Sequence, residues 1–248
     1  GMATVLIGIV ALALLLWALH SFARADPKRL RVLTSDGEFH SARRQFARWA
    51  EDGWFEVETV AAEPFDDFSE RFLAAASRGD HDLILVSQML FGSGCLFDAV
   101  DDLAALGRPE GPWVVIDGYH SFMAIDAPLS ATAAKSAFFL AGGYKYAMAG
   151  EGMGLMHCPP GFGPRPPLTG WYAEFDDLTL PPGMVGYAKD AMRFMGATFD
   201  PSALYRFNHV RAMLAANGLT TAAISAHVAR LQASRAIPKA RGFDRAAA

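Results

Sequence analysis

The sequence predicts an α/β protein built on a mostly parallel β-sheet. Short apolar runs alternate with longer amphipathic stretches between about residues 30 and 140, which is the rhythm of strand, helix, strand. Two of these runs, HDLILVS at 81–87 and WVVI at 113–116, are apolar almost throughout instead of alternating. Strands of that kind are typical of parallel sheets that helices cover on both faces. We therefore expect a three-layer sandwich of helices, sheet and helices.

Each element follows from its local pattern. Strands are expected at 30–33, 55–60, 81–87, 113–116 and 137–140, and helices at 42–51, 65–77 and 98–106. Asp66 and Asp67 favour the start of the second helix, because acidic side chains stabilise helix N-termini. Two more helices are expected at 201–217 and 221–234, with Asn217-Gly218 as a helix stop and Thr220 or Thr221 as the next cap.

Residues 159–183 form a long predicted loop that contains seven prolines. Loops of this length in a compact domain are usually functional or disordered. Trp171 and Tyr172 in its middle indicate a loop that is docked and functional.

The two ends of the chain differ from the middle. The run from Ala3 to Leu19 is uncharged and mostly apolar, and Arg24, Lys28, Arg29 and Arg31 follow it. Its length is at the lower edge of a membrane-spanning helix, so both a buried helix and a membrane anchor fit, and we favour the buried helix. Residues 235–248 show no apolar period, which predicts a poorly ordered tail after one large domain at 1–234.

Composition excludes several classes of function. A formal net charge of −4 disfavours binding to nucleic acid. The two cysteines, Cys95 and Cys158, are too few and too far apart for a disulfide framework, and we expect them to be reduced in the cytoplasm. No metal site is expected, because four of the histidines do not have the spacing of metal ligands in the sequence. These are His81, His157, His209 and His227.

Chemically active side chains follow two of the predicted strands. The run WVVI leads directly into Asp117 and His120, and the run AFFL leads through a Gly-Gly pair into Tyr144 and Lys145. Ligands of open parallel sheets bind at the carboxyl ends of the strands. An acid, a histidine and a lysine at that edge suit pyridoxal 5'-phosphate (PLP), since the acid keeps the pyridine nitrogen protonated and the lysine holds the aldehyde as a Schiff base. The alternative is a structural salt bridge between Asp117 and Lys145 beside an ordinary rim histidine.

Four segments carry a resemblance to a known family. They are VVIDGYH, GGYKYAMAGEGMGLMHCPP, LTGWYAEFDDL and RFMGATFDPSALY, in this order. Together they resemble the class V aminotransferase group of fold-type I PLP enzymes, most closely its kynureninase-like branch, from about residue 29 to about residue 218. The resemblance implies the large domain of that fold, without the N-terminal segment that cups the cofactor phosphate and without the C-terminal small domain.

The resemblance also implies roles for individual residues. Lys145 would form the Schiff base, Asp117 would partner the pyridine nitrogen, His120 would lie beside the ring and that aspartate, and Tyr144 would reach the phosphate or assist proton transfer.

Three further residues are implied to lie near the cofactor. Trp171 would reach the phosphate region of the neighbouring subunit, Thr198 would do likewise, and His40 would face the site. For the segment around His40 a plain helix cap by Ser41 is the alternative.

The sequence thus supports two functional hypotheses. The first is a homodimeric, cytoplasmic PLP enzyme with its sites at the subunit interface, acting on a small amino-acid substrate as a class V aminotransferase or a kynureninase-like hydrolase. Desulfuration is the least expected reaction, because no well-placed cysteine occurs in the final third of the chain. The second is a truncated, non-catalytic remnant that serves as a dimeric binding or structural module, attached to a membrane through residues 3–19 in one version.

Overall fold

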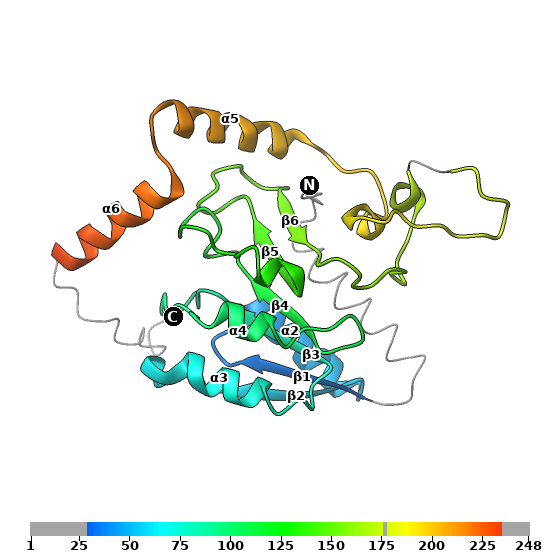
Figure 1. Cartoon of the computed structure of the whole chain (residues 1–248), viewed down its shortest axis with the longest axis horizontal. Coiled ribbons are helices and arrows are strands. Elements are labelled where there is room, and N and C mark those ends of the chain that lie inside the picture. The colour runs from blue at the N-terminus through cyan, green and yellow to red at the C-terminus, as the bar shows by residue number, and fades with distance from the viewer. Residues whose placement is uncertain (1–28, 176–177, 235–248) are drawn as a thin grey trace.

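The computed structural model describes residues 29–175 and 178–234 and confirms the α/β class (Figure 1). One six-stranded sheet has the order β2-β1-β3-β4-β5-β6. All neighbouring strands run parallel except β6, which is antiparallel to β5. The strands are β1 (Leu30–Ser35), β2 (Phe55–Val60), β3 (Leu83–Ser87), β4 (Trp113–Asp117), β5 (Ala137–Gly142) and β6 (Gly154–His157).

Three helices connect the first four strands. Helix α2 (His40–Glu51) joins β1 to β2, α3 (Phe68–Ala76) joins β2 to β3 after the short turn η1 (Phe65–Asp67), and α4 (Val100–Ala104) lies between β3 and β4. The helices match the predicted segments, although α4 is shorter than the expected 98–106.

The central strands are buried on both faces, as their apolar runs predict. In β3, Ile84 and Val86 pack with the side chains of α3 and α4, whereas Leu83 and Leu85 pack with those of α2. Successive residues of a strand point to opposite faces, so an uninterrupted apolar run serves both cores. The sequence signal and the three-layer architecture therefore have the same physical cause.

The order in which strands are added to the sheet reverses between β1 and β3, because β2 lies on one side of β1 and β3 lies on the other. From β1 the chain passes through α2 on one face to β2, and from β3 it passes through α4 on the other face to β4. Only two residue pairs, Val32 with Leu83 and Leu33 with Ile84, join β1 to β3. Such a switch point leaves a crevice at the carboxyl ends of the strands, where open α/β sheets bind ligands.

Two helices follow the sheet and lie above it and to its left in Figure 1, and the first of them shares a small hydrophobic cluster with Leu155 of β6. These are α5 (Ser202–Ala216) and α6 (Thr221–Ser234), close to the predicted ranges. Gly218 has a φ of +66°, which confirms the helix stop, because glycine adopts the left-handed region without strain. The hydroxyl of Thr220 accepts a hydrogen bond from the Ala223 N–H at 3.1 Å, which confirms the cap at Thr220.

The predicted cap by Ser41 is wrong. Helix α2 begins at His40 with Phe39 at its N-cap and without a side-chain cap, so Ser41 already lies inside the helix.

Residues 159–183 contain no strand among those described, and their only regular piece is the turn η3 (Trp171–Glu174). The segments expected as a buried helix or anchor at 3–19 and as a tail at 235–248 lie outside the described residues. Within 29–175 and 178–234, no helix has the length and apolar character needed to cross a membrane.

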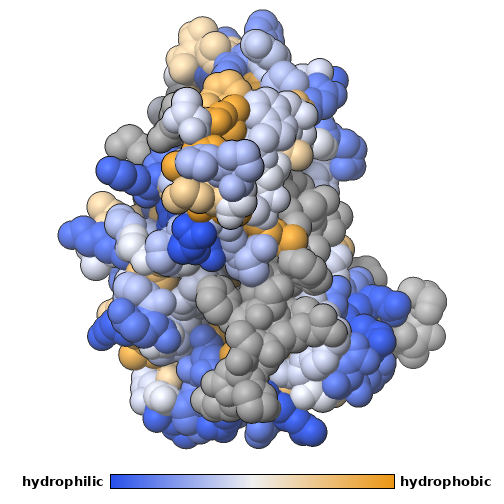
Figure 2. Space-filling model, turned by 90° about the vertical axis from the view of Figure 1, so that its right-hand side faces the viewer, coloured by the Kyte–Doolittle hydropathy of each residue, from blue (hydrophilic) through white to orange (hydrophobic). Residues whose placement is uncertain are grey.

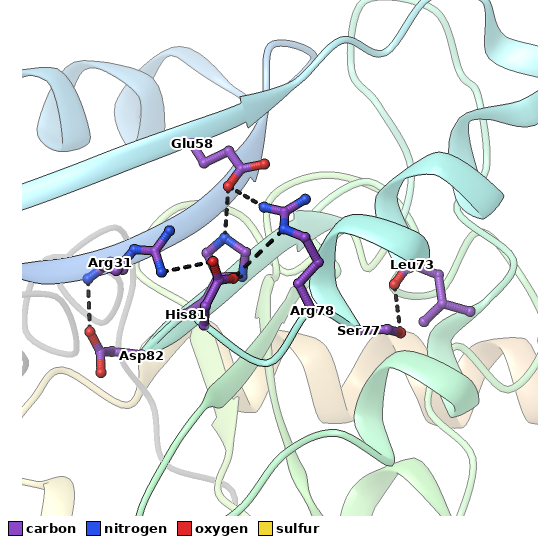
Figure 3. A network of polar contacts seen from close by, with 8 residues as sticks. Arg31, Glu58, Leu73, Ser77, Arg78, His81 and Asp82 are labelled. Carbon is purple, nitrogen blue, oxygen red and sulfur yellow. Dashed lines mark hydrogen bonds and ion pairs between the residues drawn. The ribbon is translucent and has the colours of Figure 1, made fainter.

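A polar network joins the starts of β1 and β3 to β2 (Figure 3). His81 Nε2 lies 3.0 Å from Glu58 Oε2, and Arg78 forms an ion pair with the same carboxylate. The guanidinium of Arg31 forms an ion pair with Asp80 at 2.8 Å, and the backbone N–H of Arg31 donates a hydrogen bond to the Asp82 carboxylate. These groups lie away from the strand ends that carry Asp117 and Ser87, so the network serves packing and not the candidate site.

In the described part of the chain no group of His, Cys, Asp or Glu side chains could hold a metal ion.

Candidate functional site

The ends of β4 and β5 bring Lys145 and His120 into contact. Strand β4 ends at Asp117, and β5 ends at Gly142, three residues before Lys145. Lys145 Nζ contacts His120 Nε2 and lies 3.4 Å from His120 Nδ1, although the two residues are 25 positions apart. The predicted meeting of Asp117, His120 and Lys145 at one edge of the sheet is therefore what the structure shows.

Asp117 is a buried carboxylate with an open oxygen. The residue is only 8 % exposed, and its Oδ1 accepts a hydrogen bond from the backbone N–H of Tyr119 at 2.9 Å. No described residue donates a hydrogen bond to Oδ2. Burial raises the pKa of Asp117 to about 6, while the Tyr119 N–H and the charge of Lys145 act in the opposite direction. A buried carboxylate with one hydrogen bond is costly unless a further donor or cation reaches it.

The structure does not support the alternative of a simple salt bridge. No ion pair within 4 Å joins Asp117 to Lys145 in the described chain, and the amine contacts His120 instead. Asp117 still acts on Lys145 through space, since its charge raises the pKa of the amine. Desolvation is the larger effect, and it lowers the pKa of Lys145 overall.

His120 is neutral at physiological pH. Burial lowers its pKa to about 4, and the positive charge of Lys145 acts in the same direction. A neutral imidazole has one ring nitrogen that can accept a hydrogen bond, so His120 can accept one from the Lys145 ammonium without adding a second positive charge to the site.

Aromatic rings surround the amine. Lys145 Nζ lies 5.3 Å from the ring centroid of Phe39, 6.0 Å from that of Tyr119 and 5.8 Å from that of Tyr144. Lys145 is half-buried, and these rings reduce the contact of its amine with water, which contributes to the desolvation that lowers its pKa. Tyr144 has its ring near the amine of its neighbour Lys145, and its role toward a phosphate or in proton transfer stays a prediction.

Glycines allow this close packing. A Cβ atom on Gly142 would lie 2.2 Å from Tyr119 Cε1, and one on Gly143 would lie 2.6 Å from the sulfur of Met153. Neither site has room for a side chain. The Gly-Gly pair before Tyr144 and Lys145 is therefore required for the chain to pass beneath Tyr119 and to turn Lys145 into the site.

An aromatic cluster, defined as Phe39, His40, Phe91 and His120, covers the crevice at the switch point. Phe39 and Phe91 meet edge to face at 5.3 Å between centroids, and Phe39 and His120 lie 6.3 Å apart. His40 is 5.6 Å from Phe39 and 5.2 Å from Phe91, so it is at the mouth of the site, exposed and without a contact to Lys145. Sequence analysis expected His40 here but missed Phe39, whose ring centroid lies 5.3 Å from the amine.

The structure does not bring Trp171 or Thr198 to Lys145 within one chain. Trp171 packs against Tyr172 and Phe175 and is 49 % exposed. Thr198 is exposed in the loop before α5. No hydrogen bond or ring contact joins either residue to Asp117, His120 or Lys145. Their proposed place beside a neighbouring subunit's phosphate stays a prediction.

Glu38 is a buried acid that sequence analysis also missed. It is fully buried, and its Oε1 accepts a hydrogen bond from Ser35 Oγ at 2.7 Å. Its Oε2 accepts one from Ser87 Oγ at 2.5 Å, and the Ser87 N–H lies within 3.1 Å of both oxygens. Burial raises the pKa of Glu38 to about 7. The only available sequence signal was its position just after a predicted strand and beside His40.

Both cysteines are free thiols away from Lys145. Burial raises the pKa of Cys158 to about 12 and also raises the pKa of Cys95. Neither environment favours a thiolate.

The fold has clear counterparts among solved structures. The cysteine desulfurase of Thermococcus onnurineus NA1 matches with a TM-score of 0.63 at 18% identity, over 84% of this chain and 51% of that one. The Escherichia coli cysteine desulfurase CsdA matches with a TM-score of 0.61 at 13% identity, over 80% and 50%. A mutant of C-DES with glycine covalently linked to its PLP cofactor matches with a TM-score of 0.60 at 16% identity, over 83% and 54%.

These matches confirm the α/β fold class with its mostly parallel sheet, and they show the fold alone. The chain spans about half the length of the solved structures it matches. Two of these proteins are cysteine desulfurases, and the third, C-DES, is a cystine C-S lyase. None of the three is a kynureninase. No protein-family model matches the sequence, and the search of curated proteins found no match.

Proposed function

We propose that the site at the ends of β4 and β5 binds PLP and acts on an amino-acid substrate. One observation carries the proposal: a buried carboxylate with an open oxygen, Asp117, lies at the same strand ends as a lysine amine whose pKa is lowered by desolvation. The pyridine nitrogen and the aldehyde of PLP need these two groups. The C-DES structure, with its linked PLP, supports the proposal through the shared fold.

The residues present fit the cofactor in their chemistry. Asp117 would hold the pyridine nitrogen, Lys145 would bind the aldehyde covalently, and Phe39 with Tyr119 would supply flat apolar surfaces for the ring. Bound there, PLP would supply an electron sink for bonds at the substrate α-carbon. Tyr144, Trp171, Thr198 and His40 remain candidates for contacts to the phosphate and to the substrate.

The protein groups have distinct tasks in this proposal. The lowered pKa of Lys145 increases the share of free amine, which is the nucleophilic form, near neutral pH. When released by the substrate, the same amine can accept and return a proton at its Nζ. Neutral His120, in contact with that Nζ, orients the amine and accepts its hydrogen bond. Asp117 stays charged above about pH 6 and so favours a protonated pyridine nitrogen.

The reaction we propose is transamination or kynureninase-like hydrolysis of an amino acid, with the chain in the cytoplasm. Desulfuration requires a thiolate nucleophile near the substrate, and the raised pKa values of Cys95 and Cys158 do not favour one. The desulfurase names among the structural matches therefore support the cofactor and the fold more than the reaction.

We also propose that two copies of the chain associate. Helix α6 has no buried residue from Thr221 to Leu231, and Val228 and Leu231 on it are exposed. Further exposed apolar side chains occur at Tyr205 on α5 and at Met184 and Phe175 in the long loop. Figure 2, which views the right-hand side of Figure 1, shows apolar surface in several places among hydrophilic surface. Analytical ultracentrifugation over a range of concentrations tests this: a dimer is expected, and a monomer at all concentrations would reject it.

The decisive experiment for the cofactor is a titration of the purified protein with PLP. The expected result is an absorbance band at about 420 nm that disappears on reduction with borohydride, because hydride converts the imine to a secondary amine and leaves a stable adduct on the peptide containing Lys145. Lys145→Ala should lose both the band and the adduct. Lys135→Ala, which removes an exposed lysine before β5, is the matched control and should keep them. No band at saturating PLP would reject the proposed function.

A further inference from the structure

Glu38 occupies the crevice where β1 and β3 separate. The ladder between these strands ends at the pair Leu33 and Ile84, so the backbone N–H of Ser87 at the end of β3 has no strand partner on the β1 side. The Glu38 carboxyl takes this place, with both oxygens within 3.1 Å of the Ser87 nitrogen. A buried N–H without an acceptor is costly, so this contact stabilises the open end of the sheet.

The same carboxyl joins two segments that are far apart along the chain. Ser35, at the end of β1, donates its hydroxyl to Oε1, and Ser87, 49 residues beyond Glu38, donates its hydroxyl to Oε2. Ser87 is in turn the register partner of Asp117 in β4. Through these contacts the turn between β1 and α2 is tied to the strand that neighbours Asp117.

The residue after Glu38 is the one whose ring lies beside the amine. Phe39 is the N-cap of α2, and its ring centroid is 5.3 Å from Lys145 Nζ. A backbone held on one side by α2 and on the other by a buried, multiply hydrogen-bonded side chain leaves little freedom for that ring. The placement of Phe39 is therefore mechanically linked to Glu38.

We infer that Glu38 is a positioning residue of the proposed cofactor site: by spanning Ser35 and Ser87 it holds Phe39 beside Lys145 and reduces the contact of the amine with water. The inference rests on the proposed function for what the site binds, while the placement itself can be tested without cofactor. The span and its hydrogen bonds matter here more than the charge, because the charge that acts on the pKa of Lys145 is that of Asp117. An amide of the same length should therefore replace it.

The test is the pH dependence of Lys145 acetylation in the full chain without PLP. Competitive labelling with acetic anhydride, followed by mass spectrometry of the peptides, yields the titration midpoint of Lys145, with the exposed Lys135 and Lys189 as internal references. Phe39→Ala should raise the midpoint toward the ordinary value of a lysine, because water then reaches the amine. Glu38→Ala should shift it in the same direction, whereas Glu38→Gln should keep the wild-type midpoint. Glu70→Ala removes an exposed glutamate of α3 and is the matched control.

A folded Glu38→Ala protein with the wild-type midpoint would overturn the inference, as would Glu38→Gln shifted as far as Glu38→Ala. Should Glu38→Ala fail to fold, Ser87→Ala removes one of the donors to the carboxyl, and an unshifted midpoint there would overturn it equally. If the midpoints behave as expected but wild type forms no adduct with PLP, the proposed function fails and the positioning of Lys145 by Glu38 stands.

Discussion

Lys145 Nζ contacts the imidazole of His120, and the carboxylate of Asp117 at the end of β4 acts on the charge of Lys145. The pKa values of the three groups are shifted in opposite directions. Burial raises the pKa of the acid and lowers those of the two bases, so each environment favours the neutral form of its group. A site in which ionisable groups are held away from their ordinary pKa values is typical of catalytic centres, although ion-pair networks can do the same.

Asp117→Asn should separate function from stability. An asparagine cannot stabilise a protonated pyridine nitrogen as a carboxylate does, so PLP affinity should fall about 30-fold, measured by titration of the absorbance band. The cofactor-free protein should in contrast be more stable than wild type at pH 8. A buried acid whose pKa is raised from 3.8 to about 6 loses stability as the pH rises through that window, and the amide does not. Loss of stability at pH 8 would contradict this account.

The stability of the wild type should depend on pH through Glu38. Its pKa is raised from 4.5 to about 7, so the folded state binds a proton that the unfolded state has released between these values. The contribution of this group is therefore fully present below pH 4.5 and decreases up to pH 7, by about 3 kcal/mol. Denaturant unfolding at pH 5 and pH 8 measures it. Glu38→Gln should show a smaller difference between the two pH values than wild type does, and an equal difference would argue against a buried, titrating Glu38.

His120 should titrate well below the ordinary histidine range. Its proton resonance, assigned by its absence in His120→Gln, is expected to have a midpoint at about pH 4. Because the pKa is lowered from 6.5, the stability contribution of this residue is present above pH 6.5 and is lost as the pH falls toward 4. A midpoint near 6.5 would mean that His120 is solvated and not packed against Lys145.

Gly142→Ala should damage the fold at the site. The new methyl group would lie 2.2 Å from the Tyr119 ring, so either the ring or β5 must move, at a cost of about 2 kcal/mol in the free energy of unfolding. Gly92→Ala is the control, since nothing lies within 4 Å of its Cβ position. Denaturant melts of both variants check the prediction. Equal stabilities would show that the close approach of Gly142 to Tyr119 is not required.

The local pattern of the sequence was enough to predict the strands of the sheet and the helices that cover it. Fully apolar runs such as 83–86 in β3 can be stable only where both faces are buried, and the six-stranded sheet has helices or loops on both faces. Asp117 and Lys145 were found for the same reason, because Asp117 directly follows one such run and Lys145 follows the next one after a Gly-Gly pair. Helix α4 was overestimated, since the apolar spacing continues beyond the residues that keep helical hydrogen bonds.

The sequence by itself determined the fold class, the strand ends and the acid, histidine and lysine that they carry, because these depend on periodicity and chain order. Only the tertiary structure decided that Phe39, and not His40, lies against the amine, that Lys145 contacts His120 and not Asp117, and that Glu38 bridges β1 and β3. Such contacts join residues distant in the chain, and their partners are selected by the order and register of the strands. Register is a property of the whole packed sheet, so no local pattern of residues contains it.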